Sequence, residues 1–334
     1  MCLAPDGSHL LVANKLDVSV AVIDPDNPSS AQVISVPITG SNTGGPVFVA
    51  ATSNGNVLIS IGGISGPWTG SLFELNLTSL KVQSLTIPGV FTGDGPKLSP
   101  TADGSTILVR GYGGPVGIWS VPSAQFVPVV DNFAGAGLGA AAGDGNIFAA
   151  GMGFIAPDGS SIVGMGIPDE IGGFQSISPN DAALNESGSL EFVPAGNKLF
   201  IFDTHHGNLL QSMVLPNQVN VWTKVIALDS TGEHVFLSDS QGLTVLTLTA
   251  ALLAIGSITP STVPATGGTV VQIRGSGFQA SSAVAIGGNP AMVTFVDANT
   301  LQVTTPANPG GAARMIIQNP GGESYTLDAA VLYQ

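Results

Sequence analysis

The hydrophobic residues of this chain recur in one short phrase: an apolar approach, a turn of Asp-Gly or Asn-Gly type, and three or four more apolar residues. Such dipeptides accept the positive φ angles of tight turns between antiparallel strands. The run after the turn, as in Val57-Leu58-Ile59, is continuously apolar, which indicates a strand covered on both faces. Six copies are spaced by 36 to 55 residues when aligned on their turn glycines, which are Gly7, Gly55, Gly104, Gly159, Gly196 and Gly232.

Antiparallel sheets that are covered on both faces and recur at this spacing are typical of propeller blades. We therefore predict an all-β fold, with a β-propeller of about six blades, some of them incomplete, over residues 1–250. A β-sandwich with strong hairpins is the alternative for the same pattern. A further match to the turn, Gly143-Asp144-Gly145, lies only 14 residues before Gly159. Because this interval is too short for a blade, we interpret the segment as a distorted outer strand and connection.

The first repeat contains the most specific motif. Leu11-Val12-Ala13-Asn14 is followed, after a polar link, by Val18-Ser19-Val20 and Val22-Ile23-Asp24. This stretch resembles the YVTN-type repeat of WD40-like β-propellers, although the Tyr and Thr of that motif are absent. The resemblance implies a fold and says nothing about a ligand.

Near residue 256 the pattern changes to strict alternation. In Thr269–Arg274 the residues Thr269, Val271 and Ile273 alternate with partners that we expect to face solvent, as in a sandwich strand. The opening Ile258–Ser261, the Gly-Gly-Thr…Gly-x-Gly-Phe core and the closing Asn-Pro-Gly-Gly follow in the order of the IPT/TIG domain, which this stretch resembles. The resemblance implies an immunoglobulin-like β-sandwich over residues 256–334, after the propeller of residues 1–250.

Charge and cysteine content narrow the class of partner. The net charge is −14, from 8 basic and 22 acidic residues, so the basic surface that nucleic acid or an anionic membrane requires is missing. The abundance of uncharged polar residues suggests a secreted or cell-surface bacterial protein. Cys2 is the single cysteine, which excludes an internal disulfide and a cysteine zinc site. The most apolar window, Leu243–Ile255, is too short to span a bilayer, so we expect no membrane insertion.

The two ends of the repeat region look incomplete. Met1–Asp6 lacks the basic and apolar segments of a signal peptide, and only four residues precede the first turn. The sixth repeat likewise passes into the linker without a clear fourth strand. We therefore expect the natural reading frame to extend upstream, with at least one more strand and a secretory signal, and we expect an extracytoplasmic location.

Few side chains form a recognisable chemical site. Asp203, His205 and His206 are the candidate metal ligands, but we favour an ordinary polar turn for them. His9 and His234 each stand two residues after a turn glycine, where a strand begins, and are assigned no chemistry. The oxygen-rich turns at Asp24–Asn27 and 169–170 lack the spacing of a calcium loop, so we expect no metal.

Function follows mainly from the two resemblances. They imply a non-enzymatic extracytoplasmic binding protein that uses propeller loops and the TIG module to contact protein or carbohydrate. One alternative is a propeller-type hydrolase or lyase with titratable groups gathered at a central channel, and another is a structural spacer. We assign no catalytic residue and no cofactor, since the sequence has neither a G-x-S-x-G elbow nor a glycine-rich phosphate loop.

Overall fold

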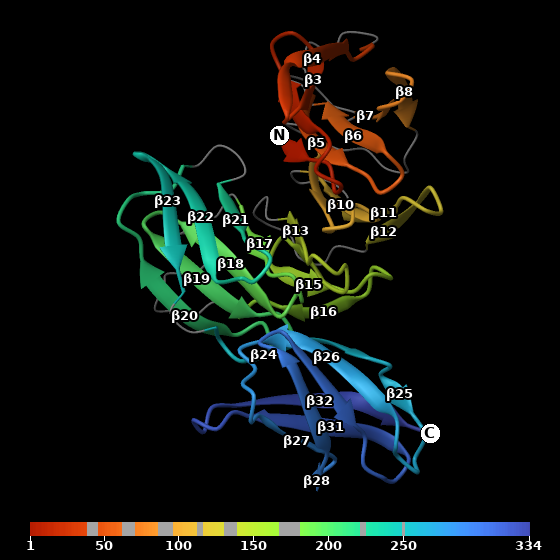
Figure 1. Cartoon of the computed structure of the whole chain (residues 1–334), viewed down its shortest axis with the longest axis vertical. Helices are drawn as coiled ribbons and strands as arrows, with labels where there is room; N and C mark the ends of the chain where they lie inside the picture. Colours follow the sequence, from red (N-terminus) through yellow and green to blue (C-terminus); the bar gives the residue numbers. More distant parts are fainter. Residues whose placement is uncertain are drawn as a thin grey trace. The chain divides into compact units, whose positions relative to one another are not determined.

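The computed structural model describes residues 1–38, 46–61, 71–85, 96–111, 116–129, 139–166, 181–220, 225–248 and 251–334 (Figure 1). These residues form strands and turns, so the fold is all-β as predicted. Contacts divide the chain into two compact units, Met1–Gly164 with Ser178–Ala182 and Met165–Ile177 with Ala183–Gln334. In the part of the chain that the structure describes, no helix is long and apolar enough to cross a membrane.

The first unit contains four sheets, each built from four consecutive antiparallel strands. The first sheet comprises β1 (Cys2–Leu3), β2 (Leu10–Asn14), β3 (Ser19–Asp24) and β4 (Asn27–Ser35). The second comprises β5 (Pro46–Ala51), β6 (Asn56–Ile61), β7 (Ser71–Asn76) and β8 (Lys81–Leu85). The third comprises β9 (Lys97–Pro100), β10 (Thr106–Arg110), β11 (Val116–Ser120) and β12 (Gln125–Val129). The fourth comprises β13 (Gly139–Ala141), β14 (Phe148–Ala150), β15 (Gly153–Ile155) and β16 (Ser161–Gly164).

Successive sheets of the first unit share their cores in pairs. In β6, Val57 and Ile59 join the apolar cluster of the first sheet, whereas Leu58 between them joins the cluster of the third sheet. The strand β10 repeats this arrangement, with Leu108 packed among residues of the fourth sheet. All four side chains are fully buried. The continuous apolar runs are therefore covered on both faces, as their sequence predicted, because alternate residues contact different neighbouring sheets.

The first hairpin turns of these sheets are also joined to one another. The backbone N–H of Ser53, in the second sheet, donates to the carbonyl oxygen of Gly104 in the third over 2.9 Å. The N–H of Ala102 donates in the same way to Gly143 in the fourth sheet, also over 2.9 Å. The first hairpin turns of the second, third and fourth sheets are therefore hydrogen-bonded one to the next, although the acceptors Gly104 and Gly143 occupy different positions in their turns.

The structure corrects the predicted repeat register at two turns. Gly159 lies between β15 and β16, and Gly196 lies between the second and third strands of the fifth sheet. The hairpins that join first and second strands there contain Gly145 and Gly188, both with positive φ. The interpretation of Gly143–Gly145 as a distorted outer strand is therefore wrong, because β13 and β14 flank it as a regular hairpin. The cause is that every hairpin of a sheet accepts the same Gly-containing turn, while the short, Gly- and Ala-rich β13 leaves little apolar signal.

The second unit begins with two further sheets. The fifth sheet comprises β17 (Ala183–Leu184), β18 (Leu190–Ala195), β19 (Lys198–Asp203) and β20 (Leu209–Val214). The sixth sheet has three strands among the described residues, namely β21 (Ile226–Leu228), β22 (His234–Asp239) and β23 (Gly242–Thr247). Both sheets are antiparallel throughout.

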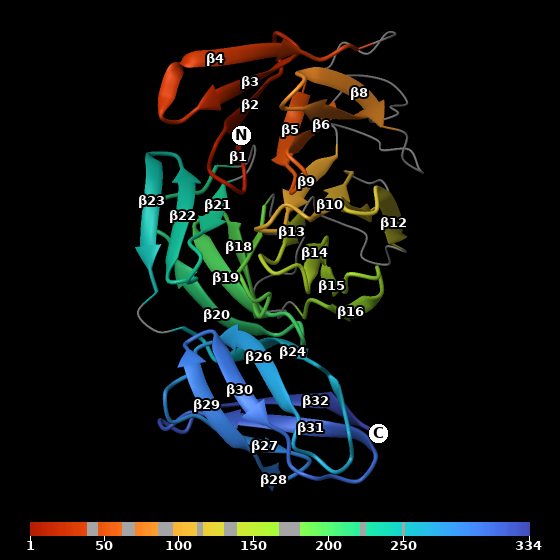
Figure 2. The same ribbon diagram turned by 45° about the vertical axis from the view of Figure 1, so that its right-hand side comes forward.

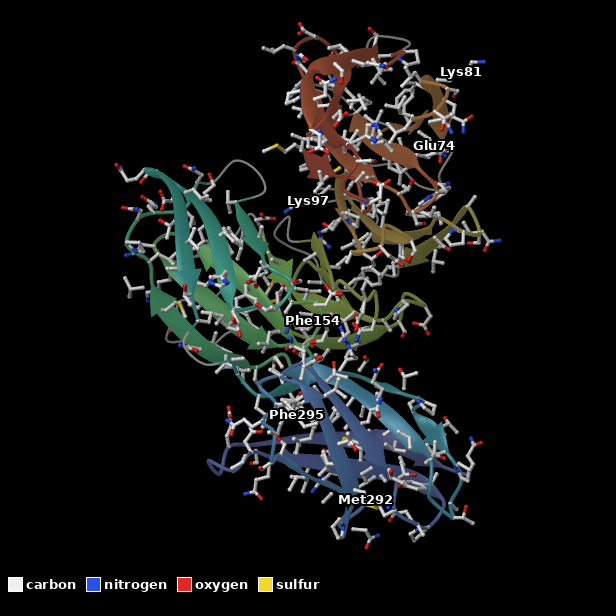
Figure 3. The ribbon with its side chains drawn as sticks, viewed as in Figure 1. Glu74, Lys81, Lys97, Phe154, Met292 and Phe295 are labelled. Atoms are coloured by element: carbon white, nitrogen blue, oxygen red, sulfur yellow. The ribbon has the colours of Figure 1, made fainter. Side chains whose placement is uncertain are left out.

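The C-terminal part of the second unit is a sandwich of two sheets. One sheet has the order β24 (Ala254–Thr259), β26 (Val270–Ser276), β30 (Thr300–Thr304) and β29 (Met292–Asp297). The other has the order β25 (Thr262–Val263), β32 (Ser324–Tyr333), β31 (Gly311–Gln318), β27 (Ala283–Ile286) and β28 (Asn289–Pro290). Val271 and Ile273 are fully buried and Val270 is exposed, which confirms the predicted alternation in β26. On β29, Phe295 packs against the core while Met292 lies exposed (Figure 3).

Candidate functional site

A buried polar cluster joins the fifth sheet to the sandwich within the second unit. Asp203 ends β19 with only 2% of its surface exposed, and Tyr325 approaches it from β32. The Tyr325 hydroxyl donates to Oδ1 of Asp203 over 2.8 Å, and Oδ2 of Asp203 pairs with Nδ1 of His206. The rings of His206 and Tyr325 lie 5.3 Å apart. Two of the three candidate metal ligands therefore meet, but as a hydrogen-bonded pair completed by a tyrosine.

His205, the third candidate ligand, faces a different partner. Its Nε2 lies 2.9 Å from the carbonyl oxygen of Gly256 in β24. Burial lowers the pKa of His205 below its ordinary value, against the opposing effect of this hydrogen bond. A carbonyl oxygen only accepts, so Nε2 carries the proton and donates. In the described residues no group of three His, Cys, Asp or Glu side chains is arranged to hold a metal ion.

Sequence reasoning missed Tyr325 entirely. It lies 122 residues from Asp203, in a segment without a motif, and only the fold brings the two together. Burial first, and then the neighbouring Asp203 carboxylate, raise the pKa of Tyr325 above its ordinary value. The hydroxyl therefore stays protonated and remains a donor to Asp203 at any physiological pH.

Serine side chains complete this junction. The hydroxyl of Ser187, in the first turn of the fifth sheet, donates to the carbonyl oxygen of Gly275 over 2.8 Å. Ser189 donates to the Ser276 hydroxyl over 3.0 Å, and all of these serines are buried. Gly256 approaches the same turn so closely that a Cβ built on it would lie 1.8 Å from the backbone carbonyl oxygen of Ser187. The sandwich thus docks on the fifth sheet through buried polar groups that are satisfied by one another.

A second candidate site is a groove between the first two sheets. A cavity of about 380 Å³ lies against the first hairpin turns, lined by Asp6, Ser8, Asn56 and Asp103 among others. A second cavity of about 290 Å³ lies beside β3 and β4. His9, Leu77 and Thr78 line both cavities, and we call the two neighbouring cavities together the hairpin groove.

Several titratable groups are buried away from both sites. Lys97 in β9, labelled in Figure 3, forms a buried ion pair with Asp181. Glu191 in β18 is fully buried, and neither carboxylate oxygen has a hydrogen-bond partner among the residues that the structure describes. Burial alone raises the pKa of Glu191 to about 8. Glu191 is therefore protonated at neutral pH.

The remaining polar candidates lie in turns or at the start of a strand. His234 pairs with Asp229 over 2.7 Å, and Nδ1 of His9 contacts the Ser8 hydroxyl over 2.7 Å. In the turn Asp24–Asn27, the Asp24 carboxylate accepts from the backbone N–H of Asp26, which is the hydrogen bonding of an ordinary turn. The second oxygen-rich turn, at 169–170, lies outside the described residues.

Comparison with known proteins identifies the C-terminal sandwich. Residues 253–333 match the family model of the IPT/TIG domain, which confirms that predicted domain. A stretch of 96 residues is 33% identical to Fibrocystin-L from Mus musculus. That match covers 27% of this chain and 2% of the relative, so the chain spans a very small part of that protein's length. TIG domains generally mediate protein interactions, and these two findings indicate a non-enzymatic interaction module.

Proposed function

We propose that the chain is an extracytoplasmic binding protein in which a six-bladed β-propeller presents its hairpin turns to a partner protein. The pairwise sharing of cores between successive four-stranded sheets carries this proposal, since it is the packing that propeller blades require. TIG domains are common in extracellular and surface proteins, which supports the proposed location. The proposed domains are a propeller over 1–250 and the TIG domain over 256–334.

The hairpin groove is the proposed contact surface of the propeller. It lies across two sheets and presents hydroxyl, amide and carboxylate groups, which suit the polar rim of a protein interface. Thr78 lines both cavities and is exposed, so a bulky side chain at this position would obstruct the groove. Ser79 beside it is also exposed and lines neither cavity.

Quantitative affinity purification from the native source, using the full chain as bait, tests this function. We expect one protein to be enriched in near-stoichiometric amount and to be lost at least tenfold with Thr78→Trp, but retained with Ser79→Trp. Equal recovery with both variants would remove the groove from the proposal. Failure to enrich any protein with the wild-type chain would contradict the binding function itself.

The enzymatic alternative rests on one observation, the buried ion pair of Lys97 and Asp181. It brings two titratable groups together from positions 84 residues apart, as a site at a propeller channel would. Under this alternative, Lys97→Met abolishes turnover of an ester or glycoside substrate by the full chain. Under the binding function, the same variant alters stability and leaves partner binding in place.

A further inference from the structure

The sixth sheet differs from the other five at its outer edge. In the described residues it ends at β23, its third strand, whereas every other sheet of the repeat region continues to a fourth (Figures 1 and 2). Third strands elsewhere are largely buried, as β11 and β19 show. In β23, by contrast, Leu243 is 68% exposed and Val245 is 50% exposed. Among the described residues, none occupies beside β23 the position that a fourth strand takes in the sister sheets.

The register of β23 shows which backbone groups face that open edge. The N–H of Leu248 donates to the carbonyl oxygen of Glu233 over 2.8 Å, so these two residues form a hydrogen-bonded pair. Hydrogen-bonded pairs alternate with non-hydrogen-bonded pairs along an antiparallel ladder. Leu246 and Thr244 consequently bond to β22, while the N–H and C=O groups of the intervening residues point outward. Those outward residues are Leu243, Val245 and Thr247, whose side chains are all exposed.

The edge has none of the features that protect a free strand. Natural edge strands are commonly protected by lysine, proline or a bulge, and β23 has none of these. Residues 225–248 include the acidic residues Asp229, Glu233 and Asp239 and neither Lys nor Arg. Glu233 is exposed at one end of β23, and Asp239 stands at the other, where Gly242 donates to its carboxylate. A strand that completes this sheet would be favoured by positive charge.

We propose that the free edge of β23 docks an extended, lysine- or arginine-bearing segment of a partner protein, which adds as the antiparallel fourth strand of the sixth sheet. Main-chain hydrogen bonds to Leu243, Val245 and Thr247 supply the affinity, as in other strand-addition complexes. Alternate apolar side chains of the segment pack beside Leu243 and Val245. The class of partner rests on the proposed protein-binding function, whereas the edge itself is a property of the sixth sheet.

A synthetic peptide with the sequence of another strand of this chain can test binding to the edge of β23. Leu209–Val214 forms the fourth strand of the neighbouring fifth sheet, so a synthetic peptide of this sequence, flanked by lysines and fluorescently labelled, resembles the missing strand. We expect it to bind the full chain in an anisotropy titration. At saturation, the amides of Leu243, Val245 and Thr247 should exchange at least tenfold more slowly. The same peptide with proline at two central positions should not bind.

Variants of Val245 distinguish a loss of peptide binding at the strand edge from a loss of folding. Val245→Pro removes an outward N–H without removing a ladder bond, and it should weaken the peptide at least tenfold. Val245→Thr keeps the N–H and should bind within about threefold of wild type. Val245→Lys keeps the backbone but repels the lysine-flanked peptide, so it should bind weakly even if the proline variant does not fold.

Four outcomes would overturn the proposal. These are absence of binding at millimolar peptide, wild-type affinity in a folded Val245→Pro variant, protection of a different strand, and dimerisation of the free chain through β23. The last would assign the edge to a second copy of this chain. None of them affects the purification test with Thr78→Trp, so failure of this inference is distinguishable from failure of the proposed function.

Discussion

One turn glycine of the repeat region and one of the TIG domain share a backbone conformation but differ in their surroundings. Gly196, in the fifth sheet, has φ of 60°, and a Cβ built there would meet nothing within 4 Å. Gly277, in the TIG domain, has φ of 71°, and a Cβ there would lie 2.7 Å from the Ala251 carbonyl oxygen. The first position needs only a conformation that Asn or Asp can also adopt, whereas the second also needs the missing side chain. Gly277 should therefore tolerate a side chain less well than Gly196.

The two regions also differ in what they bury. The repeat region buries Asp203 and Glu191 as well as the Lys97–Asp181 pair. Across residues 251–334, which the structure describes without a gap, the buried polar side chains are uncharged. They are Ser276, Ser282, Thr300, Thr305 and Asn319. Responses of stability to pH should therefore originate in the repeat region and its junction, and not in the TIG core.

The largest expected effect tests the contrast between glycines. Gly277→Ala should lower the free energy of unfolding by about 4 kcal/mol, from backbone strain together with the clash against the Ala251 carbonyl. Gly196→Ala should cost only about 1 kcal/mol, since it adds strain alone. Urea titration of the full chain measures both. Equal losses would show that close approach does not distinguish the two regions.

The next effect concerns the buried carboxyl of Glu191. Its pKa is raised from 4.5 to about 8, so the folded state keeps a proton that the unfolded state releases above pH 4.5. Stability should therefore fall as pH rises from about 5 to 8. Glu191→Gln should remove this slope and raise the free energy of unfolding at pH 7 by about 3 kcal/mol. Chemical denaturation at several pH values checks this, with exposed Glu233→Gln as the control. A slope that survives Glu191→Gln would contradict the assignment.

A smaller effect on the free energy of unfolding is expected where the fifth sheet meets the TIG sandwich. Tyr325→Phe removes the hydroxyl that donates to the buried Asp203 carboxylate and should cost about 2 kcal/mol. Tyr333 provides the matched control, because its buried hydroxyl has no hydrogen-bond partner in the described part of the chain. Tyr333→Phe should be neutral or slightly stabilising. Thermal unfolding of both variants measures the difference, and a loss in Tyr333→Phe equal to that in Tyr325→Phe would contradict it.

The smallest expected effect is the pH dependence of stability that arises from His205. Because burial lowers its pKa, the unfolded state binds a proton more readily than the folded state as pH falls below the ordinary histidine value of about 6.5. This contribution to stability is thus present above that pH and lost below it. The melting temperature should fall between pH 6.5 and 5, and His205→Gln should reduce the fall. His9→Gln, in a half-exposed turn, should leave it unchanged. A fall in melting temperature that persists in His205→Gln but is reduced in His9→Gln would show that the pH response arises outside the junction.

The sequence by itself determined the local part of this structure. Continuous apolar runs such as Val57-Leu58-Ile59 predicted strands buried on both faces, and the alternation of Thr269–Arg274 predicted the half-buried strand of the TIG sandwich. Both predictions depend on the side-chain period of a strand, which is a property of neighbouring residues. The order of the TIG motifs was equally readable from the sequence.

Only the tertiary structure decided which hairpin each turn belongs to and which distant residues meet. The same glycine turn serves any hairpin of a sheet, so the repeat register at Gly145 and Gly188 depended on strand pairing. Tyr325 reaches Asp203 because β32 packs beside the end of β19, a juxtaposition that neither local sequence encodes. The open edge of β23 is likewise a property of the sheet, since backbone groups become free or paired according to which strand lies beside them.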